Sequence, residues 1–108
     1  MEAKQAIKWL QRAAEEGNAQ AQFKLGLQYA YGRNVAPNDN EAIAWWKRAA
    51  TNKSASAQYC LGVMYESGRG VEYDRRLANQ YFDLASAHGF RPQKNSRHTL
   101  KRKCTQKY

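Results

Sequence analysis

The side chains that most often perform catalysis are few in this chain and poorly spaced for it. A serine followed three residues later by a lysine would place a nucleophile and a base on one helical face, but no serine here has a lysine at that spacing. His88, His98 and Cys104 could form a nucleophile–base pair or a metal cluster, yet their spacing fits no known pattern of either kind. We therefore predict no catalytic residue, no metal ligand and no cofactor, and expect that the protein is not an enzyme.

The chemistry that the composition does allow is electrostatic, and it is concentrated at the C-terminal end. Residues 1–90 carry 11 basic and 9 acidic side chains, whereas residues 91–108 carry 7 basic and no acidic ones. Such a cluster can neutralise phosphates on nucleic acid or on anionic lipid. The candidate anion contacts are Arg97, Lys101, Arg102 and Lys103.

This basic tail lacks the interleaved aromatic residues on which nucleic-acid bases stack, and it matches no nucleic-acid-binding motif. We therefore favour a solvated extension, in which Phe90 and Leu100 cover Tyr81 and Phe82. Electrostatic binding of nucleic acid or of an acidic surface through the tail is the alternative function.

The sequence shows no segment that would enter a membrane. No apolar run approaches the roughly 20 residues that cross a bilayer, and the N-terminus lacks the apolar stretch of a secretory signal. Cys60 and Cys104 are too few to indicate a disulfide framework and do not have metal-ligand spacing, so they leave the compartment open. We expect a soluble protein, cytoplasmic by default, with no membrane span.

The elements that must position these side chains follow an internal repeat of 36 residues without a gap. Self-similarity at a fixed period is typical of solenoid proteins, in which each unit packs on its neighbours. A series from Asn18 to Val35 recurs from Ser54 to Val71. A second series occurs three times: Ala6, Trp9, Leu10, Ala13 and Ala14; Ala42, Trp45, Trp46, Ala49 and Ala50; and Ala78, Tyr81, Phe82, Ala85 and Ser86.

Each unit contains the start and stop signals of two helices. Asn18 is an N-cap residue for a first helix that should run to about Tyr31. A turn at residues 32–35 follows, because glycine and asparagine tolerate a positive φ. The second helix should begin near Asn38. The equivalent positions in the next unit are Ser54, Ser67, residues 68–71 and Asp74.

Apolar residues lie on two stripes of the first helix, with Phe23 and Leu27 on the second stripe, so this helix should have neighbours on both sides. Gly26 recurs as Gly62 in a helix interior, where glycine costs about 1 kcal/mol relative to alanine, and close backbone approach to the adjacent helix would explain it. Tryptophans should fill the wider gaps between helices; they are Trp9, Trp45 and Trp46. We predict an all-α fold, a right-handed α/α solenoid of antiparallel helix pairs.

These residues resemble a known family. The pattern Ala-x-x-Trp-x-x-x-Ala-Ala, then Gly-x-Ala-x-Ala-Gln-Phe-x-Leu-Gly-x-x-Tyr, then Gly-Arg-Gly-Val is similar to the Sel-1-like repeat (SLR), a relative of the tetratricopeptide repeat (TPR). The resemblance covers Ala6 to Gly89. It implies a superhelix of helix pairs that serves as an adaptor or scaffold for protein complexes, and it does not identify the partner.

The sequence departs from the family pattern in two places. Lys53 stands where the family usually has glycine, which should make that helix junction less favourable. After Gly89 the pattern stops. We therefore predict a repeat domain over residues 1–90, made of an N-terminal half unit and two full helix pairs, and a basic tail over residues 91–108. The uncapped ends of so short an array should be covered by further repeats, by the tail or by a second subunit.

The face of the first helices that is not used in stacking should line a concave groove. We expect a non-enzymatic interaction module or scaffold that presents this groove to a protein or peptide partner. Arg33 and Arg69 should be structural, reaching helix-end carbonyls or acidic neighbours. The residues predicted to contact the partner are Gln20, Lys24, Gln28 and Tyr31 from one unit and Ser56, Cys60, Met64 and Ser67 from the next.

Overall fold

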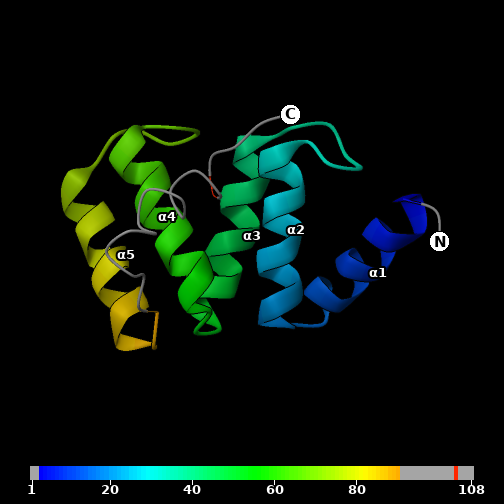
Figure 1. Cartoon of the computed structure of the whole chain (residues 1–108), viewed down its shortest axis with the longest axis horizontal. Helices are drawn as coiled ribbons and strands as arrows, with labels where there is room; N and C mark the ends of the chain where they lie inside the picture. The colour runs from blue at the N-terminus through cyan, green and yellow to red at the C-terminus, as the bar shows by residue number, and fades with distance from the viewer. Residues whose placement is uncertain (1–2, 91–103, 105–108) are drawn as a thin grey trace.

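The computed structural model describes residues 3–90 and Cys104. Within these residues the chain forms five α-helices and no strand, and the helices follow one another along the long axis of the molecule (Figure 1). The predicted all-α class is therefore confirmed. The helices are α1 (Ala3–Glu15), α2 (Ala19–Tyr31), α3 (Asp39–Thr51), α4 (Ala55–Ser67) and α5 (Arg75–Ala87).

The predicted N-caps are confirmed. Asn18 Oδ1 accepts a hydrogen bond from the amide of Ala21 at 2.9 Å and so satisfies a first-turn donor of α2. At its other end α2 stops at Gly32, whose φ of +75° is left-handed and whose Cα faces the ring of Pro37. The residues that cap α3, α4 and α5 in the same way as Asn18 are Asn38, Ser54 and Asp74.

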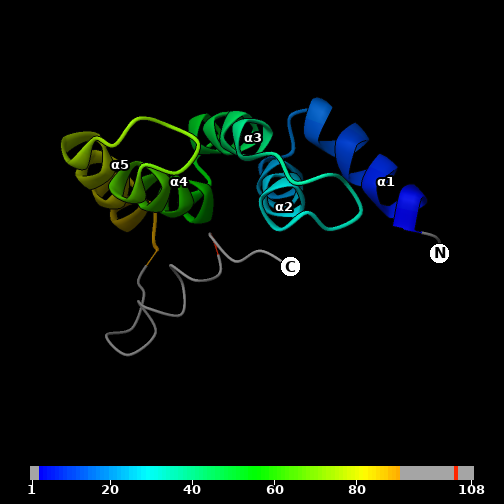
Figure 2. The ribbon, with the colours of Figure 1, turned by 90° about the horizontal axis from the view of Figure 1, so that it is seen from above.

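The helices pack as two pairs, α2 with α3 and α4 with α5, and the pairs join where α3 packs on α4. Helix α1 packs on α2. Seen from above, α2 and α4 lie on the same side of α3, so the first helices of the two units share one face of the array (Figure 2). The predicted solenoid of helix pairs is thus confirmed for the described residues.

Each helix pair contains the same kind of close contact, and this contact explains the recurring glycines. A Cβ atom at Gly26 would overlap the indole of Trp46, and one at Gly62 would overlap the ring of Phe82. Trp46 is fully buried and donates through Nε1 to the carbonyl oxygen of Phe23 at 3.1 Å. Tight packing at these glycines is therefore present, but an aromatic side chain of the partner helix makes the contact, and not its backbone as expected from the sequence.

Buried glutamines connect each first helix with the second helices on either side. Gln22 Nε2 donates to the carbonyl oxygen of Ala14 at 2.9 Å, and Gln22 Oε1 accepts from Asn52 Nδ2 at 3.1 Å. Because Ala14 belongs to α1 and Asn52 follows α3, one amide group joins three helices. One unit later the same three positions hold Gln58, Ala50 and His88, with distances of 3.0 and 2.9 Å.

The tryptophans do not all lie between helices. Trp46 is fully buried, and Trp45 is partly buried against the cluster that contains Ile7 and Leu25. Trp9 is 65% exposed, so the prediction that it fills a gap between helices is wrong for the described residues. The physical reason is that Trp45 packs on the unit before it, and no described helix precedes α1 to do the same for Trp9.

Candidate partner-binding groove

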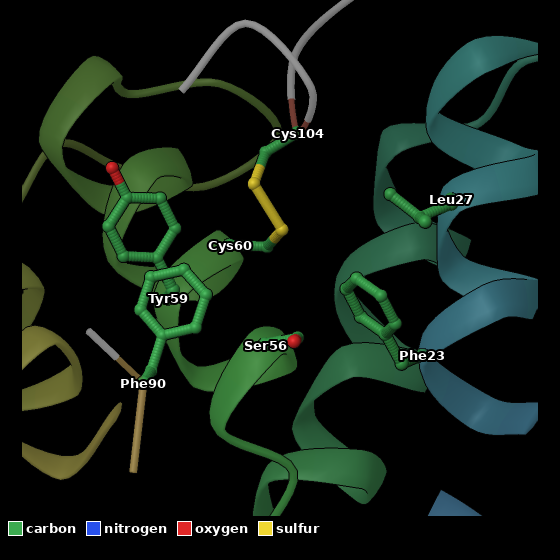
Figure 3. Close-up of a pocket in the computed structure, with 7 residues that line it drawn as sticks. All are labelled: Phe23, Leu27, Ser56, Tyr59, Cys60, Phe90 and Cys104. Carbon is green, nitrogen blue, oxygen red and sulfur yellow. A yellow bond between two sulfur atoms is a disulfide. The ribbon is translucent and has the colours of Figure 1, made fainter. Parts of the chain in front are cut away.

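A small pocket lies between α2 and α4, on the face that these two helices share (Figure 3). Its volume is ≈ 80 Å³, more than twice the roughly 30 Å³ that one water molecule occupies in the liquid. Apart from two hydroxyl groups its lining side chains are carbon and sulfur. The lining residues are Phe23 and Leu27 from α2, Ser56, Tyr59 and Cys60 from α4, and Phe90 and Cys104 from beyond α5.

Aromatic rings close the pocket on the side of α5. The ring of Phe90 stacks on Tyr59 with centroids 4.6 Å apart, and Tyr59 in turn contacts Phe82 at 5.3 Å. Offset and tilted ring pairs at these distances are favourable beyond their buried area. Phe90 therefore stacks on Tyr59 and not on the predicted Tyr81 and Phe82, and Tyr81 stacks on Tyr65; Leu100 lies outside the described residues.

Cys60 and Cys104 form a disulfide that lines the pocket (Figure 3). Their Cα atoms are 5.4 Å apart, within the range that a disulfide spans. Both side chains are buried, and 44 residues separate the two in the chain. Neither the number nor the spacing of the cysteines indicated this bond, because only the folded chain brings Cys104 back to α4.

The eight predicted contact residues differ in their exposure. Cys60 and Met64 are buried, Cys60 bonded to Cys104 and Met64 in the core. Met64 therefore presents no surface to a partner, and Cys60 presents only the small part that lines the pocket, which corrects their inclusion as exposed contacts. The remaining six are exposed or partly exposed: Gln20, Lys24 and Ser67 are exposed, and Gln28, Tyr31 and Ser56 are partly buried.

Two residues of the groove were not predicted from the sequence. Phe23 and Leu27 were assigned to a stripe of α2 that packs on neighbouring helices, and they do contact the core cluster. They also line the pocket, because packing against the core leaves part of each side chain uncovered. The signal that could have found them is the period, since Phe23 is the counterpart of Tyr59.

The rim of the groove beside α2 is neutral to positive. Burial raises the pKa of the Tyr31 hydroxyl above its ordinary value, and the charge of Arg33 opposes this shift only in part. The Tyr31 hydroxyl therefore stays protonated at neutral pH and can donate a hydrogen bond. Gln28 Oε1 accepts from Asn34 Nδ2 at 3.4 Å, and Lys24 is exposed one turn before Gln28.

Arg69 is structural, as predicted from its recurrence in the loops. Its guanidinium donates to both carboxylate oxygens of Asp39 at 3.1 and 3.0 Å and to the carbonyl oxygen of Ala30 at 3.2 Å. It thereby joins the turn after α4 to the end of α2 and the start of α3. Arg33 is in the equivalent position one unit earlier, where Ala3 replaces the aspartate, and its guanidinium lies 5.8 Å from the centre of the Tyr31 ring.

The described residues hold no metal-binding group of three or more His, Cys, Asp or Glu side chains. No helix among residues 3–90 has the length and apolar character to cross a bilayer. His98, part of the cluster considered for catalysis, lies outside the described residues, as do the predicted anion contacts Arg97, Lys101, Arg102 and Lys103.

The repeat is similar to a known protein family and to known structures. A family model described as Sel1 repeat matches residues 3–18, 19–54 and 55–90, and these boundaries coincide with the 36-residue units. The chain belongs to the Sel1 repeat family. The predicted resemblance is therefore confirmed, and this family generally consists of modules that interact with proteins.

Two solved structures are similar to this Sel1 repeat chain. One is c5321, a protective antigen present in uropathogenic Escherichia coli strains and displaying an SLR fold, with 39% identity and a TM-score of 0.79 over 82% of this chain and 19% of that one. The other is a Sel1 repeat protein from Oxalobacter formigenes, with 36% identity and a TM-score of 0.78 over 82% of this chain and 36% of that one. The chain thus spans about a fifth and about a third of their lengths. No curated protein matches it.

Proposed function

We propose that this Sel1 repeat chain is a non-enzymatic interaction module and that a protein or peptide partner binds in the groove between α2 and α4. The observation that carries the proposal is the pair Phe23 and Leu27, which keep apolar surface uncovered beside a pocket that the core does not fill. Apolar pockets with a few polar groups at the edge are the usual form of a binding site.

The polar groups at the edge suit an extended peptide. Amide and hydroxyl side chains can donate to and accept from a peptide backbone, and exposed Lys24 favours an acidic side chain nearby. An apolar side chain of the partner would enter the pocket against Phe23 and Leu27, where exclusion of water gives most of the binding free energy. The edge residues in this proposal are Gln20, Lys24, Gln28, Tyr31, Ser56 and Ser67.

The test combines capture of partners on the purified chain with measurement of affinity for each captured protein. Lys24→Glu and Tyr31→Ala should each weaken binding by about tenfold, which corresponds to about 1.4 kcal/mol. Lys8→Glu and Tyr73→Ala are matched controls, because both residues are exposed and lie away from the pocket. Affinities that are unchanged in the groove variants, or equally reduced in the controls, would refute the groove.

The basic tail supports the alternative, electrostatic binding of nucleic acid. The observation in its favour is the positive charge of residues 91–108, which include seven basic residues and no acidic one. Replacing the predicted anion contacts with glutamine, while keeping Cys104, should abolish binding of a single-stranded oligonucleotide if the tail is the site, and should flatten its dependence on salt. Retention of protein partners by this variant would favour the groove. The variant changes Arg97, Lys101, Arg102 and Lys103.

A further inference from the structure

The disulfide lies within the proposed groove and affects the two repeat units unequally. By the 36-residue period Cys60 on α4 is the counterpart of Lys24 on α2. Lys24 is exposed, whereas Cys60 is only 3% exposed and is bonded to Cys104. Cys104 therefore occupies, in the second unit, the groove position that the first unit leaves open to a partner.

A covalent bond ties Cys104 to Cys60 in the groove. Cys104 is a member of the buried cluster that also contains Leu61 and Met64, but it contributes one small side chain to it. Figure 3 shows the bond facing Phe23 and Leu27 across the pocket. Departure of Cys104 would uncover Cys60 and extend the apolar surface of the pocket along α4.

We propose that the Cys60–Cys104 disulfide is a redox-controlled latch that closes the α4 half of the groove to partners. The inference rests on the proposed function, since it concerns access to the same surface. A dithiol reductant opens the latch: two electrons and two protons pass to the disulfide, its S–S bond breaks, both cysteines become thiols, and the dithiol closes to its own disulfide. Cys104 then leaves the groove, and Cys60 becomes accessible.

The test measures access to Cys60 with a small probe, so it does not depend on a partner. Cys104→Ser leaves Cys60 as a thiol, and its alkylation by iodoacetamide is followed under native conditions. The matched control is Lys24→Cys in a Cys60→Ser/Cys104→Ser background, which places a thiol at the equivalent exposed position on α2. Each rate is divided by that of the same variant in denaturant, which removes differences in intrinsic thiol reactivity.

A latch predicts that Cys60 in Cys104→Ser reacts within about tenfold of the control thiol. A rate more than about a hundredfold slower would overturn the proposal, because Cys60 would then be covered without the bond. Circular dichroism of the reduced wild-type chain should keep the helical signal. Loss of that signal would also overturn the latch, since the bond would then hold the fold together instead of controlling access.

Binding of a captured partner separates this proposal from the proposed function. Reduced wild type and Cys104→Ser should bind the partner at least about tenfold more tightly than oxidised wild type. Equal affinity of all three, together with loss of binding in Lys24→Glu, would refute the latch and keep the groove. An accessible Cys60 with no effect of Lys24→Glu would instead refute the groove as the partner site.

Discussion

At the scale of single residues, the repeat conserves contacts even where it changes the side chain. Gln58 Nε2 donates to the carbonyl oxygen of Ala50, so Gln58 Oε1 is the atom that faces His88 Nδ1 at 2.9 Å. His88 must then carry its proton on Nδ1 to complete this contact. In the preceding unit an asparagine amide, that of Asn52, donates to Gln22 in the same place. An imidazole and a carboxamide thus perform one structural task.

This equivalence predicts that His88→Asn preserves stability while His88→Ala does not. Alanine at position 88 leaves Gln58 Oε1 without its protein partner. The cost should be only about 1 kcal/mol, because His88 is exposed and water can take the place of its ring. That loss corresponds to a fall of roughly 4–8 °C in Tm for a domain of this size. Differential scanning calorimetry of the two variants checks it, and equal Tm values would show that the contact has no energetic weight.

At the helix-interior glycines, the sign of the stability change on substitution by alanine tests the close packing. In an open helix Gly→Ala would stabilise by about 1 kcal/mol. Gly26→Ala should instead destabilise by about 1 kcal/mol or more, because the new methyl group overlaps the Trp46 indole and overpacked cores typically lose 1–3 kcal/mol. Urea unfolding of Gly26→Ala measures the difference, and a rise in the midpoint would contradict the close contact seen here.

At the scale of the helices, the junctions between units follow one backbone pattern with one exception. The residue two positions after each second helix has a left-handed φ: +97° at Gly17, +69° at Lys53 and +95° at Gly89. A residue with a side chain is strained in this conformation, whereas glycine is not. The less favourable junction predicted at Lys53 is therefore confirmed in its backbone geometry.

Lys53→Gly and Gly17→Lys should change the stability of the chain in opposite directions. Lys53→Gly removes the strain and should stabilise the chain by about 0.5–1 kcal/mol, less the entropy that glycine adds to the unfolded state. Gly17→Lys should destabilise by about 1 kcal/mol through φ alone, since a Cβ there meets no atom within 4 Å. Denaturant midpoints of both variants check this, and shifts of the same sign would contradict it.

At the scale of the whole molecule, packing is uneven along the array. Eight residues of α4 are buried, and this helix contacts both α3 and α5. Helix α1 packs on α2 and leaves Trp9 largely exposed. In a solenoid each unit gains its stability from its neighbours, so a helix covered on one side should open more readily than one covered on two.

Hydrogen exchange should therefore show a gradient. Backbone amides of α1 should exchange fastest among the five helices, and those of α4 slowest, when peptides are followed by mass spectrometry. Trp9→Ser should leave the gradient unchanged, because its side chain contributes little buried surface. Equal protection of α1 and α4 would mean that the array opens only as one unit.

The amino-acid sequence by itself determined the helix boundaries, the caps, the tight glycine contacts and the family, because each depends on residues close in the chain or repeated at one period. Only the tertiary structure decided which positions form the pocket. Phe23 and Leu27 remain partly uncovered at a pocket between α2 and α4, which both pack on α3, and buried Cys60 is bonded to Cys104, 44 residues away in the chain. A local sequence pattern carries no information on the pocket or on the pairing of Cys60 with Cys104, since both depend on how residues far apart in the chain lie in space.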